Sequence, residues 1–68
     1  MQQALLAPDS EMQVYSVCFF EDDFVVPDVM LIDAADDDDA LAEARGRRPF
    51  TTREVWSRHR LVGVIPPR

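Results

Sequence analysis

The chain has 68 residues and a formal net charge of −6, and 47% of its residues are hydrophobic. A chain of this length forms one small domain, which buries only about 60% of the surface that its unfolded form exposes. Cys18 is the only cysteine and His59 the only histidine, which excludes an intrachain disulfide and a Cys/His zinc cluster. A lone thiol and the lack of a long apolar run predict a cytoplasmic protein without a membrane segment.

The first segment, residues 1–11, contains Pro8 and has no hydrophobic period, so we expect a disordered leader before one domain over residues 12–68. Residues 13–20 are rich in β-branched and aromatic side chains and predict a strand. After a charged turn at 21–23, residues 24–33 predict a second, antiparallel strand. Its Pro27 cannot donate a backbone hydrogen bond, so we expect pairing from Val29 onward.

Residues 36–45 predict a short helix, with aspartates in its first turn and an apolar stripe at Ala40, Leu41 and Ala44. Gly46 stands at the C′ position, where glycine commonly ends helices. Residues 53–57 and 61–65 predict two more strands, joined by a hairpin turn. The order ββαββ predicts an α+β fold, in which a small antiparallel sheet of three to four strands carries one helix on one face.

One helix covers only one side of such a sheet, yet the strands are apolar on both sides. If Tyr15, Val17, Phe19, Met30 and Ile32 lie under the helix, a second apolar set faces away from it: Cys18, Phe20, Val29, Leu31 and Trp56. An uncovered apolar sheet face is unusual for a monomer. Two explanations stay open: the leader or Phe24 folds over this face, or a second copy of the chain or another protein binds it.

Charge is segregated along the chain. Residues 1–44 contain twelve acidic and no basic residues, whereas residues 45–68 contain seven arginines and one acidic residue. One or two aspartates satisfy a helix N-terminus, so a run of four exceeds the needs of capping. The acidic surface that we expect consists of Glu21, Asp22, Asp23, Asp36, Asp37, Asp38 and Asp39. Such a surface either binds a basic protein, for example in a nucleic-acid-binding complex, or only keeps the protein in solution.

The arginines of the second half are interleaved with Phe50, Trp56 and His59, an arrangement typical of nucleic-acid-binding patches. Several of these arginines follow the predicted helix or flank the predicted turn, where they have a structural role. The net charge of −6 also opposes attraction to a polyanion. Nucleic-acid binding is therefore the third hypothesis.

The residues that carry chemistry do not form a recognisable active site. Two glycines cannot build a phosphate-binding loop, and the aspartate run lacks the spacing and the glycine of a calcium loop. Cys18 falls inside an apolar strand and His59 in a turn, so we do not expect a nucleophile and its base. We predict a protein with no enzymatic activity, no metal and no cofactor.

The segment YSVCFFEDD, the helix DDDDALAEAR and the closing EVWSRHRLVGVI together resemble a group of short uncharacterised bacterial ββαββ proteins. The residues that carry this resemblance are Glu54, Val55, Trp56, Arg60, Leu61 and Val62. The resemblance implies the fold and no activity. A weaker analogy, from size and charge alone, is to small acidic phage-encoded inhibitors such as anti-CRISPR and other DNA-mimic proteins.

The sequence favours a protein-binding module or inhibitor whose acidic surface contacts a basic protein partner. The alternative is a small homodimeric structural or accessory domain that uses the apolar set Cys18, Phe20, Val29, Leu31 and Trp56 as its interface.

Overall fold

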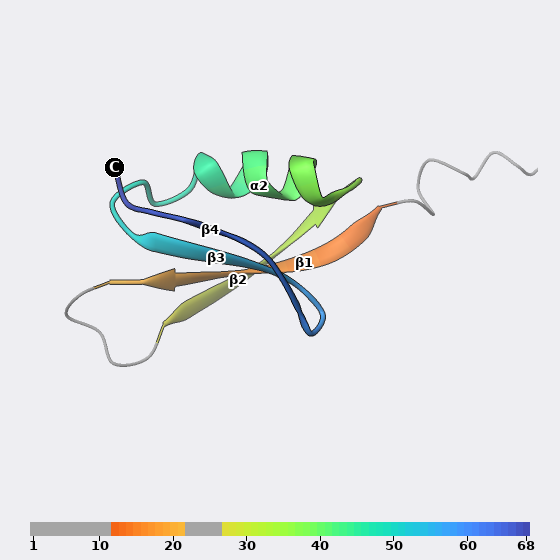
Figure 1. Cartoon of the computed structure of the whole chain (residues 1–68), viewed down its shortest axis with the longest axis horizontal. Helices are drawn as coiled ribbons and strands as arrows, with labels where there is room; N and C mark the ends of the chain where they lie inside the picture. Colours follow the sequence, from red (N-terminus) through yellow and green to blue (C-terminus); the bar gives the residue numbers. More distant parts are fainter. Residues whose placement is uncertain (1–11, 22–26) are drawn as a thin grey trace, which may run out of the picture.

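The computed structural model describes residues 12–21 and 27–68, which form a four-stranded antiparallel sheet with one helix on one face (Figure 1). In chain order the elements are β1 (Gln13–Phe20), β2 (Asp28–Ala34), α2 (Asp37–Arg45), β3 (Thr52–Ser57) and β4 (Arg60–Ile65). The predicted ββαββ order and the α+β class are confirmed. The predicted leader and residues 24–26 of the predicted second strand lie outside the described residues.

The strand order in the sheet is β2-β1-β3-β4, and all neighbours are antiparallel. β1 is paired along both edges, so Val17 faces Met30 on β2 and Val55 on β3. β2 and β3 therefore run in the same direction on either side of β1, and the connection that contains α2 crosses over β1 (Figure 1). Pro27 directly precedes β2, and pairing starts at Asp28 opposite Phe19, one residue before the predicted Val29.

The hydrophobic core lies between α2 and the covered face of the sheet. It consists of Tyr15, Val17, Phe19, Ile32, Ala34, Ala40, Ala44, Val55 and Ile65. Ala40 and Ala44 are four residues apart and point to the sheet from the same side of the helix. Their small side chains let the helix pack closely on the sheet, where it contacts β2, β3 and β4. The alternation of β1 thus places Tyr15, Val17 and Phe19 in the core, as predicted. Met30, which was expected beside them under the helix, pairs with Val17 but is 37% exposed and does not belong to the core.

The last two strands form a hairpin whose turn is Arg58–His59, with Arg58 in the left-handed conformation at a φ of 58°. The register shifts by one residue inside this hairpin, because Val55 pairs with Gly63 whereas Trp56 pairs with Leu61. Val62 is the extra residue of this bulge and packs against the core. The bulge brings Leu61 to the same face as Trp56.

The two ends of α2 are stabilised differently. At the N-terminus, the Asp36 carboxylate accepts a hydrogen bond from the Asp39 backbone N–H at 2.9 Å, as expected of an N-cap. At the C-terminus, Gly46 ends the helix as expected but stands at the C-cap instead of the predicted C′ position, with a φ of −82°, and its N–H donates to the Glu43 carbonyl. A guanidinium from β3 binds the last carbonyls of the helix, so that a glycine turn is not required there.

Candidate protein-binding surface

The face of the sheet opposite α2 carries many exposed apolar side chains. We call it the open face and define it by the alternation and register of the strands: Val14, Ser16, Cys18, Phe20, Val29, Leu31, Asp33, Thr52, Glu54, Trp56, Leu61 and Val64. No described element covers it (Figure 1). Its most exposed apolar side chains are Leu31 at 67%, Val29 at 59% and Val14 at 58%.

All five residues of the predicted apolar set lie on the open face and close together. Cys18 faces Val29 across β1 and β2, while Ser16 faces Leu31 on one side and Trp56 on the other. Phe20 is partly exposed at the end of β1, and Cys18 and Trp56 are half-buried. The two alternative covers proposed from the sequence, the leader and Phe24, lie outside the described residues.

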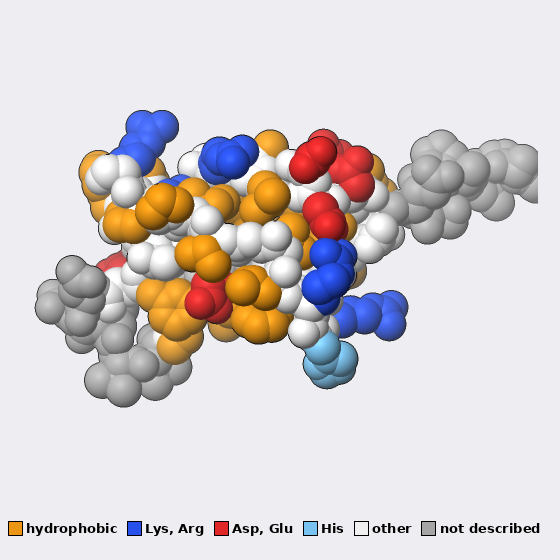
Figure 2. Space-filling model, viewed as in Figure 1, with side chains coloured by type: hydrophobic (Ala, Val, Ile, Leu, Met, Phe, Trp, Pro, Cys, Tyr) orange, Lys and Arg blue, Asp and Glu red, His pale blue; other side chains and the backbone are white. Residues whose placement is uncertain are grey.

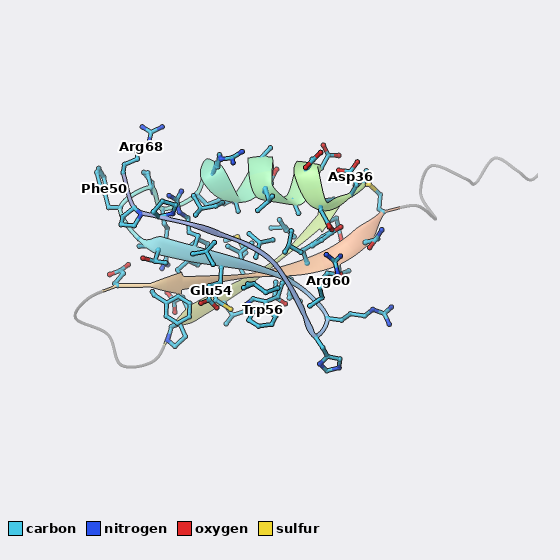
Figure 3. All side chains as sticks on the ribbon, viewed as in Figure 1. Asp36, Phe50, Glu54, Trp56, Arg60 and Arg68 are labelled. Carbon is cyan, nitrogen blue, oxygen red and sulfur yellow. The ribbon has the colours of Figure 1, made fainter. Side chains whose placement is uncertain are left out.

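The open face contains two acidic residues, Asp33 on the edge strand β2 and Glu54 on the inner strand β3. The sequence reasoning missed Glu54 as a member of this surface. The indole N–H of Trp56 donates to Glu54 Oε1 at 3.0 Å, and both side chains lie on the side of the sheet away from the helix (Figure 3). Figure 2 shows an acidic side chain bordered by hydrophobic ones at this side of the molecule. The sequence could have shown that Glu54 lies on the same face as Trp56, because residues two apart in a strand share a face.

The thiol of Cys18 is a passive member of the open face. Burial raises its pKa, and the neighbouring carboxylate of Glu54 raises it further. Because the thiolate is the reactive form, a thiol that stays protonated at neutral pH packs as a small apolar group. Cys18 therefore adds a small apolar side chain to the open face.

The structure does not bring the predicted acidic residues together. Glu21 follows the C-terminal end of β1 and lies 3.7 Å from Arg48. Asp36–Asp39 lie at the opposite end of the sheet, because Gln13 at the start of β1 pairs with Ala34 just before the helix. The eight residues of β1 separate the two groups by roughly 26 Å. Asp22 and Asp23 lie outside the described residues.

Within Asp36–Asp39, two carboxylates are used by the fold. Asp36 caps the helix, and Asp37 accepts hydrogen bonds from the buried Tyr15 hydroxyl at 3.0 Å and from two nitrogens of Arg60 at 2.9 and 3.1 Å. These bonds, first from Arg60 and then from Tyr15, lower the pKa of Asp37. Asp38 and Asp39 are exposed, and their carboxylates accept no hydrogen bond from the side chains of the described residues.

Four of the seven arginines form ion pairs or hydrogen bonds with other described residues. Arg47 pairs with Glu43, and Arg60 pairs with Asp37. Arg48 contacts Asp28 at 2.8 Å and stacks over the Phe19 ring at 4.8 Å. Arg53 is only 2% exposed.

A shallow groove of about 470 Å³ adjoins one end of the open face. It is lined by Phe20, Glu21, Arg48, Phe50, Thr51, Thr52 and Pro67. Phe50 is 80% exposed and stands at the end of the molecule that also holds the C-terminus (Figure 3). Because Phe20 and Thr52 belong to both, the groove extends the open face beyond the sheet.

Among the described residues, no three potential metal ligands of the His, Cys, Asp and Glu type cluster together. None of the helices in that part of the chain has the length and apolar character needed to cross a bilayer. Comparisons with protein-family models, with curated proteins and with solved structures found no match. The resemblance to short bacterial ββαββ proteins and the analogy to phage-encoded inhibitors therefore stay predictions.

Proposed function

We propose that this protein is a non-enzymatic protein-binding module whose contact surface is the open face and whose partner is basic. The observation that supports this proposal most directly is the exposure of Val14, Val29, Leu31, Leu61 and Val64 on one continuous sheet face. Isolated exposed apolar residues are normal, but a contiguous group of them marks an interaction surface.

The open face has the composition of an interface centre. Burying one exposed Leu or Val side chain stabilises a complex by about 1.5–3 kcal/mol before the costs of association. Trp56 lies half-buried among these residues with its indole N–H already bonded, and tryptophan is enriched among residues that dominate binding energy. The aliphatic residues thus supply apolar area that a partner can bury, and Trp56 supplies an aromatic side chain of fixed orientation at the centre of the contact.

Charge favours a basic partner over a second copy of this chain. Of the residues that make up the open face, Asp33 and Glu54 are acidic and none is basic, and the chain has a net charge of −6. Two copies that meet through this face bring like charges together, whereas a basic protein meets a complementary field. The exposed Asp38 and Asp39 add to the attraction at long range, as the acidic-surface hypothesis requires.

Two matched charge insertions test this proposal. Leu31→Glu places a carboxylate on the open face, and Ala42→Glu places the same group on the exposed side of α2. Tagged wild-type protein and the A42E variant are expected to retain the same partner from the source cells, with less retained at high salt, and the L31E variant is expected to lose it. Equal capture by all three proteins contradicts a role for the open face.

The homodimer alternative makes a different prediction for the same proteins. Analytical ultracentrifugation of the isolated wild type at micromolar concentration should show a monomer if the partner is another protein. A dimer that dissociates in L31E and persists in A42E would replace the proposed function with self-association through the open face.

A further inference from the structure

We infer that Glu54 determines the specificity of the open face by selecting a partner that presents an arginine or lysine within an apolar surface. This inference rests on the proposed function and names the chemistry of the partner. It starts from the position of one carboxylate. Glu54 belongs to the inner strand β3, between Cys18 on β1 and Val64 on β4.

The charge of Glu54 has no counterpart among the described residues. Residues 45–68 contain seven arginines and Glu54 as their single acidic residue. The ion pairs in the described part of the chain nevertheless join arginines to Glu21, Asp28, Asp37 and Glu43. Glu54 thus lies next to Arg53 in the sequence and is paired with no arginine of the described residues, and the same lack of an arginine partner holds for Asp33, Asp36, Asp38 and Asp39.

The Trp56 indole fixes Glu54 in a geometry suited to a cation. Its N–H donates to Oε1, which orients the carboxylate and leaves Oε2 without a hydrogen bond from any described residue. An incoming guanidinium can bond the carboxylate and lie against the indole ring beside it. Both contacts favour arginine or lysine over a neutral side chain at this point.

A partner that covers the open face removes water from the Glu54 carboxylate, and the free-energy cost depends on what the partner places beside it. A purely apolar partner removes water from Glu54 and leaves a buried charge unpaired, which opposes binding. A partner with one cation at the corresponding position forms an ion pair in the water-depleted centre of the interface. Glu54 therefore rejects apolar surfaces that the surrounding valines and leucines would otherwise accept.

A displayed library of random peptides tests the inference even before the natural partner is identified. The library is selected in parallel on the wild type and on Glu54→Gln, Asp33→Asn and Leu31→Glu. Gln keeps the shape of Glu54 and an oxygen that can accept from Trp56, so it removes only the charge. Asp33→Asn removes the same charge from the edge strand β2, where Asp33 is exposed.

The wild type and D33N should enrich peptides in which one Arg or Lys is flanked by apolar residues, and E54Q should lose this preference. A synthetic peptide from the wild-type selection should bind E54Q roughly tenfold or more weakly, as expected for loss of a buried charge pair. Its analogue with citrulline in place of arginine should bind wild type and E54Q about equally.

The outcomes separate the inference from the proposed function. Peptides without an enriched basic residue, or equal affinity of the arginine peptide for wild type and E54Q, overturn the role of Glu54 and leave the open face intact as a binding surface. Enrichment of the same peptides by L31E overturns the proposed function. Failure of the wild type to enrich any peptide counts against both. Unchanged thermal unfolding of E54Q shows that the variant tests binding rather than folding.

Discussion

The two faces of the sheet are made by the same four strands, and both are apolar. They differ in whether their polar groups are bonded within the protein. On the covered face, Arg53 and Tyr15 are buried and their polar atoms are bonded at either end of α2. On the open face, apolar side chains are exposed and Glu54 lacks a cation among the described residues. Stability therefore depends mainly on the covered face, which contains the hydrophobic core.

The largest expected effect on stability concerns Arg53, which is buried on the covered face at the C-terminal end of α2. Its guanidinium donates to the carbonyls of Arg45 at 2.9 Å and Pro66 at 2.8 Å, and so joins the helix end to the segment after β4. Further acceptors at 3.1–3.5 Å are the carbonyls of Ala44, Arg47, Pro49 and Thr51. This buried charge is therefore satisfied by backbone dipoles at the negative end of the helix.

We expect Arg53→Met to lower the free energy of unfolding by about 3 kcal/mol, because it fills the space but leaves several buried carbonyls without donors. Domains of this size have roughly 3–10 kcal/mol of stability in total, so the loss is a large part of it. Urea unfolding followed by circular dichroism measures the difference. The exposed Arg58→Met is the control and should change stability by less than about 0.5 kcal/mol. Equal midpoints for the two variants contradict the role assigned to Arg53.

A smaller difference in unfolding free energy is expected between alanine substitutions of two valines in β1. Val17 is 0% exposed on the covered face, and Val14 is 58% exposed on the open face. Val17→Ala removes two buried carbon atoms and should cost about 2 kcal/mol of unfolding free energy. Val14→Ala should cost less than about 0.5 kcal/mol. Chemical denaturation of both variants gives the comparison directly, and similar losses would show that the open face also contributes to the stability of the monomer.

Much of the fold could be predicted because local patterns agree with the tertiary structure. The period of two in residues 13–20 predicted which side of β1 is buried, and the aspartates at 36–39 predicted where the helix begins. The apolar set of the open face followed from the same alternation. These are properties of neighbouring residues, which a sequence displays directly, whatever the long-range contacts are.

The contacts between distant residues could not be predicted in the same way. Arg60 is 23 residues from Asp37, and Arg48 is 20 residues from Asp28, so the separation of acids and arginines in sequence gave no indication that they pair in space. The burial of Arg53 was also not predicted, because arginine is rarely buried and its acceptors are backbone carbonyls without a sequence signature. The candidate site shifted accordingly from the acidic run to the open face.

The smallest of the expected effects concerns the other end of the covered face, where Tyr15, Asp37 and Arg60 meet. Hydrogen bonds from Arg60 and Tyr15 hold the pKa of Asp37 below its ordinary value. The unfolded carboxyl has a pKa near 3.9, so the contribution of these bonds is complete above about pH 4. It is lost as the pH falls through the lower pKa of the folded state.

At neutral pH, Asp37→Asn should therefore unfold at a lower temperature than the wild type, because it removes the ion pair with Arg60. On acidification below about pH 4 the difference should shrink, since the wild-type carboxyl is then protonated as well. The neighbouring Asp38→Asn is the matched control, because Asp38 is exposed and accepts no side-chain hydrogen bond from the described residues. The measurement is the thermal unfolding temperature of the wild type, D37N and D38N at each pH across this range. If D37N differs from the wild type by the same amount at every pH, the Asp37 carboxylate is not the group that couples the helix end to the sheet.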